Sequence, residues 1–106
     1  MNVSLVVDLA PATVYSLRAT PAGGQSGRTI ALSEIADVHV VITEARDGGG
    51  IELSTQAAEE EGYLVADNET NGTVAVEIAR NSRLIDATNI QSNGSLFYKP
   101  PPITSP

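Results

Sequence analysis

The chain has 106 residues, a size typical of a single domain that buries its own hydrophobic core. It carries 13 acidic against 6 basic residues, a formal charge of −7, which argues against nucleic acid and anionic membranes as partners because phosphate binding needs clustered Lys and Arg. It has no cysteine, which excludes disulfides, thiolate nucleophiles and thiolate metal sites.

Short strand-like segments, separated by turns rich in Gly, Pro and Asn, recur at the spacing expected of a sandwich or a small barrel. At the N-terminus, Asp8 interrupts an apolar run and no basic residue precedes it, which favours a strand over a signal peptide. In chain order, the expected strands are Val3–Val7, Thr13–Ala19, Thr29–Leu32, Val38–Thr43, Ile51–Ser54, Tyr63–Ala66, Thr73–Ala79 and Gly94–Tyr98.

Two of these segments alternate residue by residue between two kinds of side chain. In Gly72–Ala79, the apolar residues Val74, Val76 and Ile78 share one face, and the residues between them share the other. The same alternation runs through Asp37–Ala45. A period of two residues predicts a strand with one buried face and one solvated face.

Turn chemistry indicates how the strands connect. Asp47 is followed by three glycines, which suit a tight or bulged turn with positive φ, so the strands on either side are expected to form a hairpin. The six residues Asp67–Gly72 are expected to join a second hairpin, made by the strands before and after them.

Helical structure is expected in short pieces only. Thr55–Glu61 is the best helix candidate, with Thr55 as its N-cap and Gly62 as its stop, although it is too short to be stable alone. Ser33–Ala36 is a turn or a single helical turn, and Asn81–Asn89 is compatible with a helical turn or an irregular strand.

These elements predict an all-β fold, an antiparallel β-sandwich of the immunoglobulin-like kind, with a jelly roll or a small barrel as alternatives and at most one or two short helical turns. Residues 1–98 are expected to form one sandwich domain. Residues 99–106 contain three consecutive prolines, which cannot enter a sheet interior and favour an extended C-terminal arm.

His39 is the only histidine of the chain. A lone histidine can bind a metal or act as a base, but either role needs partners. Asp37 and Glu44 belong to the same predicted strand, yet neither lies beside His39 on its face. We therefore expect a partly exposed strand or interface residue at this position.

Asp67–Gly72 matches the first six positions of a calcium-binding loop, with oxygen-bearing side chains at positions 1, 3 and 5 and glycine at position 6. The twelfth position, which should be a bidentate glutamate, is Ile78. A turn between strands explains the segment better, and calcium binding stays open as a weaker hypothesis.

The other polar groups form no convergent motif, so we expect no enzyme, no catalytic residue, no metal site and no cofactor. Glu59–Glu61 is an acidic contact patch or simply a solvated face. Ser54, Ser82 and Ser95 lack the context of a nucleophile elbow.

The C-terminal arm is the feature with the clearest functional interpretation. A polyproline segment has no internal hydrogen bonds and loses little entropy when it lies on a neighbouring subunit. The expected partner-contact residues are Lys99, Pro100, Pro101, Pro102 and Ile103.

Residues about 30–99 resemble a small immunoglobulin-like domain of tailed-phage structural proteins, such as the N-terminal domains of upper-baseplate proteins. The resembling features are a Leu-Ser-X-X-X-Ala-Asp-Val lead into a strand at 32–38, a strand–Asp-Gly-Gly–strand unit at 40–53, an acidic Ala-rich insert with an Asn-Gly-Thr-Val strand entry at 57–74, and the closing Gly-Ser-Leu-Phe-Tyr strand at 94–98.

The resemblance implies a non-enzymatic virion structural protein that acts through protein–protein contacts with capsid or tail subunits, as a homo-oligomer or in many copies, without nucleic acid or membrane. Upper-baseplate proteins continue into further domains, so a solitary domain with an arm is more similar to a capsid decoration (cement) protein or a small tail, neck or baseplate component. The alternative is a carbohydrate-binding or adhesin-type module, which would show an exposed aromatic platform or a calcium site.

Overall fold

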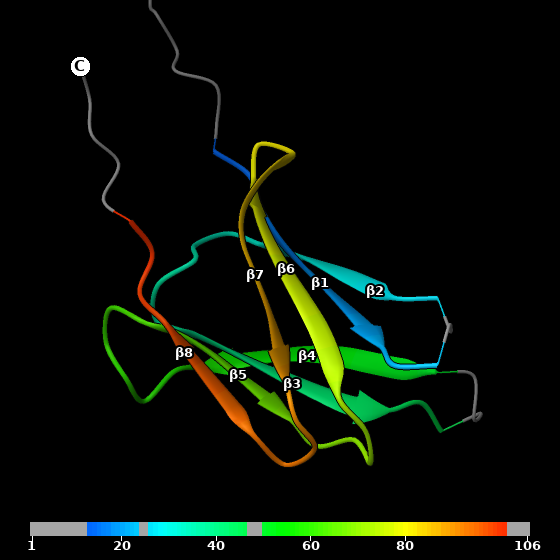
Figure 1. Cartoon of the computed structure of the whole chain (residues 1–106). Helices are drawn as coiled ribbons and strands as arrows, with labels where there is room; N and C mark the ends of the chain where they lie inside the picture. Colours follow the sequence, from blue (N-terminus) through cyan, green and yellow to red (C-terminus); the bar gives the residue numbers. More distant parts are fainter. Residues whose placement is uncertain (1–12, 24–25, 47–49, 102–106) are drawn as a thin grey trace, which may run out of the picture.

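Eight strands form two four-stranded sheets that pack face to face in a computed structural model describing residues 13–23, 26–46 and 50–101 (Figure 1). The strand orders are β2-β1-β6-β7 in one sheet and β4-β3-β5-β8 in the other. The strands are β1 (Tyr15–Pro21), β2 (Arg28–Leu32), β3 (Val38–Glu44), β4 (Ile51–Ala57), β5 (Leu64–Asn68), β6 (Val74–Arg80), β7 (Arg83–Ile90) and β8 (Ser95–Tyr98).

The predicted all-β sandwich is confirmed. Neighbouring strands are antiparallel except for β3 and β5, which run parallel. The hairpin across the Asp-Gly turn is present as β3–β4, where Ala45 N donates to Gly50 O at 2.9 Å. The expected strand Val3–Val7 lies outside the described residues.

The second predicted hairpin is wrong. β5 belongs to the β4-β3-β5-β8 sheet and β6 to the other sheet, so the segment between them crosses the sandwich. Turn residues such as Asn and Gly reverse the chain equally well within a sheet and between sheets. The sequence of this turn therefore does not distinguish a hairpin within one sheet from a connection between the two sheets.

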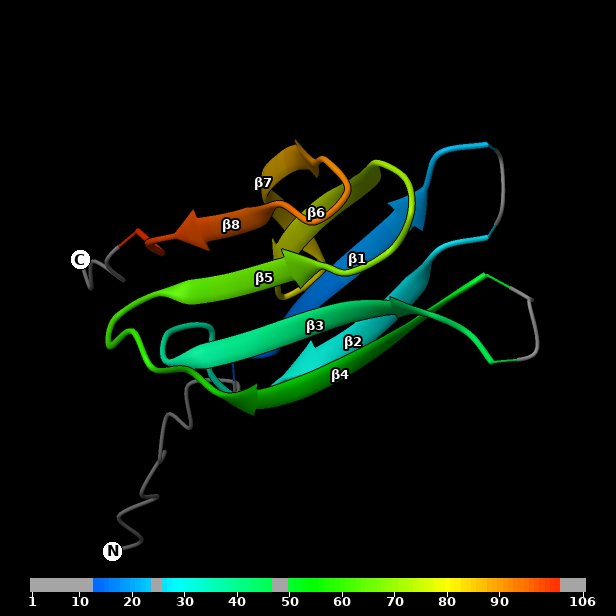
Figure 2. The ribbon, with the colours of Figure 1, turned by 90° about the horizontal axis from the view of Figure 1, so that it is seen from below.

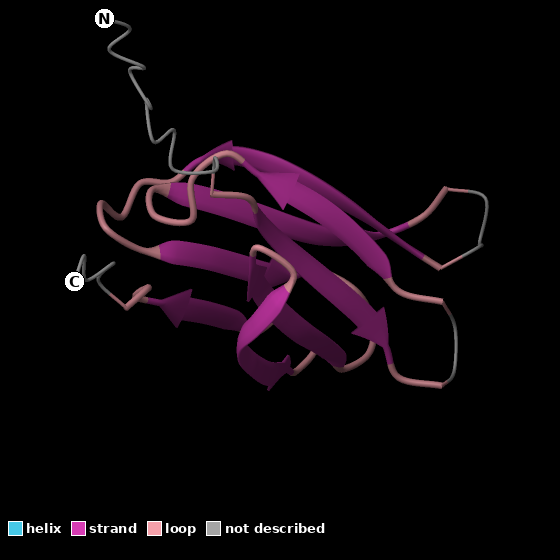
Figure 3. Cartoon of the chain, turned by 90° about the horizontal axis from the view of Figure 1, so that it is seen from above, coloured by secondary structure: helices cyan, strands magenta, loops and turns pink. Residues whose placement is uncertain are grey.

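The predicted helix over Thr55–Glu61 is also wrong, and no helix occurs among the residues that the structure describes (Figure 3). β4 instead continues through Ala57, which pairs with Val38, so the ladder with β3 prevails over a local helix preference.

Asn81–Asn89 is resolved as a turn followed by β7, an irregular strand with a register shift opposite Ile78 and Ala79. Within the described ranges, no helix has the length and hydrophobicity to cross a membrane.

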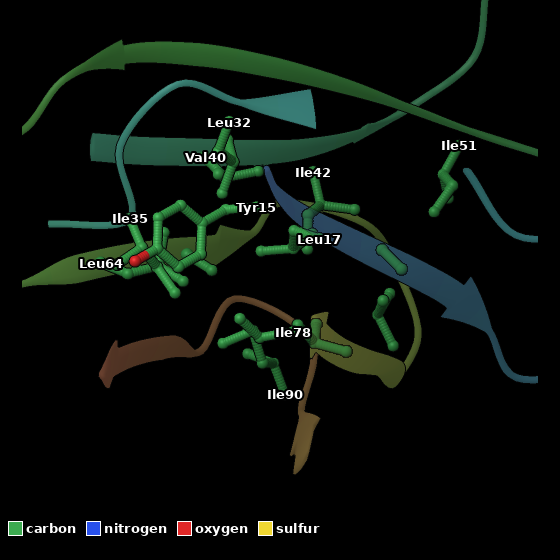
Figure 4. Close-up of a cluster of buried hydrophobic side chains, with 14 residues drawn as sticks. Tyr15, Leu17, Leu32, Ile35, Val40, Ile42, Ile51, Leu64, Ile78 and Ile90 are labelled. Carbon is green, nitrogen blue, oxygen red and sulfur yellow. The ribbon is translucent and has the colours of Figure 1, made fainter. Parts of the chain in front are cut away.

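The inward faces of both sheets build one hydrophobic core, shown in Figure 4. Its largest fully buried apolar side chains come from four strands. They are Leu17 on β1, Ile42 on β3, Leu64 on β5 and Ile78 on β6. The alternation predicted for 72–79 is thus the inward face of β6.

The two sides of the sandwich differ. On one side, β2 and β4 run close together, as Figure 2 shows, and Arg28 Nε donates to Ile51 O at 3.2 Å. On the other side, β7 and β8 are the outer strands of their sheets. A side-chain hydrogen bond therefore links the two sheets on the β2–β4 side.

Candidate functional site

Two rows of side chains cross the outer face of the β4-β3-β5-β8 sheet. Strand register places Phe97, Val65, His39 and Gln56 side by side in the first row. The second row, one pleat further along, is Ser95, Asp67, Val41 and Ser54. The alternation of β3 and β5 sends these residues outward because their neighbours Val40, Ile42, Leu64 and Ala66 fill the core.

His39, Asp67 and Ser95 form a hydrogen-bonded cluster on this face. His39 Nε2 lies 2.6 Å from Asp67 Oδ2, and Ser95 Oγ donates to Asp67 Oδ1. Because a carboxylate only accepts, Nε2 is the nitrogen that carries the proton. The side chains of His39 and Asp67 are 23% and 29% exposed, so the pair lies at the surface and remains accessible to a partner.

The cluster differs from a catalytic triad in the order of its groups. In a triad, the imidazole stands between serine and carboxylate and takes the serine proton. Here the carboxylate of Asp67 stands in the middle and accepts from both His39 and Ser95. The arrangement orients a carboxylate and an imidazole at a surface and does not activate Ser95 as a nucleophile.

A shallow concavity of about 370 Å³ lies over this cluster. Phe97, a residue that is 60% exposed, forms part of its wall, together with Gln56 and Val65. Glu59 and Glu60 contribute a second part of the wall from the loop between β4 and β5. The concavity thus combines an exposed aromatic ring, carboxylates and hydrogen-bonding groups.

The loop that carries Glu59 and Glu60 is held by one residue, Asp37, just before β3. Asp37 N donates to Tyr63 O at 2.9 Å, and Ala58 N donates to Asp37 O at 3.2 Å. The Asp37 carboxylate also accepts from Gly62 N. Asp37 has a φ of 62°, a left-handed conformation that aspartate adopts more readily than most residues. The loop is therefore tied to the sheet at both of its ends.

The Asp67–Gly72 segment is a turn organised by a buried asparagine. Asn68 is fully buried, and its side-chain Nδ2 donates to Gly72 O at 2.7 Å and to Ile90 O at 2.9 Å. Its Oδ1 accepts from Thr70 N at 3.0 Å and from Thr70 Oγ1 at 2.6 Å. Asp67, the first residue of the calcium-like pattern, points to the opposite face, toward His39.

The carboxylate at the first position of the calcium-like pattern is therefore bonded to His39 and Ser95 on the outer face, away from the turn around Asn68, which argues against the calcium hypothesis. Among the described residues, no group of three or more His, Asp or Glu side chains is placed to hold a metal ion. The predicted turn between strands is what the structure shows.

The predicted partner-contact arm is described only in part. Lys99, Pro100 and Pro101 follow β8 without joining a strand, and Lys99 and Pro101 are exposed. Pro102 and Ile103 lie outside the described residues. The arm's role in contacts stays a prediction.

The sequence missed Asp67 as the partner of His39. The sequence offers Asp37 and Glu44 as neighbours of His39 along the chain, one just before β3 and one at its end, whereas the actual partner comes from β5. The alternation of Leu64–Asn68 does place Asp67 outward, but only the parallel pairing of β3 with β5 brings it to His39.

A second concavity, of about 290 Å³, lies at the opposite end of the sandwich, beside Glu44, Thr70 and Gly72. Glu44 is the one titratable side chain among its described lining residues, and its carboxylate accepts from Asn71 N at 3.2 Å. This concavity brings together fewer chemical groups than the one over His39.

Comparison with known proteins adds no assignment: no family model matches the chain, and no curated protein and no solved structure shows significant similarity to it.

Proposed function

We propose that this chain is a non-enzymatic structural domain that acts through protein–protein contacts, and that the outer face of the β4-β3-β5-β8 sheet is its main contact surface. The observation that carries this proposal is the exposed ring of Phe97 beside the His39–Asp67–Ser95 cluster. Exposed aromatic side chains next to well-ordered polar groups are typical of the central part of protein interfaces.

The proposed setting is the virion of a tailed phage, as a capsid decoration protein or a small tail, neck or baseplate component. This setting rests on the resemblance of strand and turn pattern over residues 32–98. In such a particle, many symmetric copies make individually weak contacts strong through avidity. A net charge of −7 favours basic patches on neighbouring subunits as the complementary surface.

Site-specific photo-crosslinking tests the contact surface. A photoreactive phenylalanine analogue replaces Phe97 in one variant and Leu84, an exposed apolar residue of β7 in the other sheet, in a matched control. The chain is expressed during particle assembly, particles are purified by density gradient, and crosslinked subunits are identified by mass spectrometry. We expect a defined crosslink to one virion subunit from position 97 and none from position 84.

Two results would overturn the proposal. Absence of the chain from purified particles removes the virion setting. Its presence in particles with crosslinks from position 84 alone moves the contact surface to the other sheet.

A second candidate function is a carbohydrate-binding module, which the same surface supports because an aromatic ring beside hydrogen-bonding groups is also a sugar-binding arrangement. Phe97 would stack on the sugar ring, while Gln56 and Ser95 would bond its hydroxyls. A glycan array distinguishes the two functions, since selective binding that Phe97→Ala abolishes would favour the carbohydrate module.

A further inference from the structure

We infer that the concavity beside Phe97 receives a cationic side chain, an arginine or a lysine, of the protein partner. The inference rests on the proposed function and specifies the chemistry of the partner at one site. It is carried by three properties of the concavity: its exposed aromatic ring, its carboxylates and a described lining that contains no Lys or Arg.

The aromatic ring supplies the first contact. Phe97 is 60% exposed and stands at the wall of the concavity, on the outer strand β8. The face of an aromatic ring attracts a cation within about 6 Å of its centre, and arginine is the commonest partner. An exposed phenylalanine also offers apolar surface to the methylene stem of a long cationic side chain.

Carboxylates supply the charge. Glu59 and Glu60 approach the concavity from the loop that Asp37 holds, and Asp67 lines its floor. The Asp67 carboxylate is kept in place by His39 and Ser95, so a guanidinium or ammonium group meets an acceptor that is already oriented.

Among the described residues, no Lys or Arg lines the concavity, and the exposed Lys99 lies beyond the end of β8. The outward side chains of β3, β4, β5 and β8 include Glu52 and Asp67, and they include no Lys or Arg. The carboxylates of Glu59, Glu60 and Asp67 would therefore attract a cation into the concavity, whereas an anion such as phosphate or a carboxylate would be repelled.

The other open surface offers less for such a partner. The outward face of the β2-β1-β6-β7 sheet places Arg18 directly opposite Glu77, so its charges are balanced at the centre. Its remaining side chains are mostly small, as at Ala31, Ala75 and Ala87. Charge complementarity therefore assigns the cationic partner to the face with Phe97.

The test is a titration of the isotope-labelled chain, followed by amide chemical shifts, with N-acetyl-arginine methylamide as the probe. N-acetyl-citrulline methylamide, which has nearly the same shape and no charge, is the control ligand at equal ionic strength. N-acetyl-lysine methylamide distinguishes the two cations. We expect saturable shifts for the arginine probe at residues 39, 59, 60, 65, 67 and 97, and no saturable shifts for citrulline.

Variants locate the binding. The double substitution Glu59→Gln/Glu60→Gln is compared with Glu69→Gln/Glu77→Gln, which removes two exposed acidic charges elsewhere and so makes the same change in net charge. The first pair is expected to weaken binding about fivefold or more, and the second to change it by less than about twofold. Phe97→Leu is expected to weaken binding and Phe97→Tyr to retain it, because the tyrosine keeps an aromatic ring.

The inference is overturned if the arginine probe gives no saturable shifts, if citrulline binds as well, or if both double variants weaken binding equally. Such a result leaves the proposed function standing as long as position 97 still crosslinks to a virion subunit. Loss of that crosslink while the arginine probe still binds would instead remove the proposed partner and keep the cation site.

Discussion

The side-chain amide of Asn68 donates a 2.9 Å hydrogen bond to the backbone carbonyl of Ile90, and this bond joins the two sheets inside the core. Asn68 ends β5 in one sheet, and Ile90 ends β7 in the other. The same amide group also donates to Gly72 O, so one buried side chain closes the β5–β6 crossover and fixes it to β7.

Asn68→Asp is expected to destabilise the fold strongly. An ionised aspartate has nearly the same size but cannot donate to the carbonyls of Gly72 and Ile90, and it would place a charge in a fully buried position. We expect a loss of about 3–5 kcal/mol in the free energy of unfolding, measured by urea denaturation. Asn71→Asp makes the same charge change at an exposed position and is expected to cost less than about 0.5 kcal/mol. Equal effects of the two substitutions would contradict the role of Asn68.

Most strands could be predicted from the sequence because buried and exposed side chains alternate along a strand, a pattern that is visible in a few consecutive residues. The alternating residues Val74, Val76 and Ile78 form the inward face of β6, as their period of two residues predicts. Where a local preference competed with a distant partner, the prediction was wrong. Thr55–Ala57 has the composition of a helix start, but these residues extend β4 because β3 offers them a ladder up to Val38.

The candidate site was harder to predict, since it depends on which strands are neighbours. His39 and Asp67 meet because β5 pairs with β3 in parallel, with the whole of β4 between them in the sequence. Turn residues indicate that the chain reverses and do not say which strand it will lie beside. The residue pattern along a single strand therefore could not predict the contact between His39 and Asp67.

Gly27→Ala is expected to destabilise the β1–β2 connection. A Cβ at Gly27 would lie 2.6 Å from Thr20 Oγ1 and 2.7 Å from the backbone oxygen of Ala19, so the backbone of a buried strand residue would have to move. We expect a loss of about 1–3 kcal/mol in unfolding free energy. Gly72→Ala is the control, because a Cβ there meets nothing within 4 Å. Its thermal midpoint should stay near that of the parent chain, and a larger loss for Gly72→Ala than for Gly27→Ala would count against this packing.

The stability of the fold is expected to fall at alkaline pH through Tyr98. Burial raises the pKa of Tyr98 above its usual value of 10.0, the carboxylate of Asp86 adds to the rise, and Arg80 opposes it. A raised pKa means that the folded state holds the phenolic proton more tightly than the unfolded state does. The stabilisation is complete below pH 10 and decreases as the pH rises through the folded-state pKa.

Urea unfolding of the parent chain and of Tyr98→Phe, measured from pH 8 to pH 11.5, checks this expectation. The phenylalanine variant cannot ionise at position 98, so its stability should fall less steeply above pH 10. Identical slopes for the two proteins would show that Tyr98 has the same pKa in the folded and unfolded states.

Deletion of residues 100–106 is expected to leave the stability of the sandwich nearly unchanged while weakening attachment to a particle. Pro100 and Pro101 lie beyond β8 and take part in no strand ladder, so removing them breaks no sheet hydrogen bond. We expect a change below about 0.5 kcal/mol in unfolding free energy, measured by calorimetry. Deletion of 97–106 also removes Phe97 and Tyr98 from β8, and it should lower the thermal midpoint clearly because Tyr98 pairs with Leu64 and packs on the core. If the shorter deletion keeps both the thermal midpoint and full attachment, the arm is not a contact element and the sheet face alone accounts for binding.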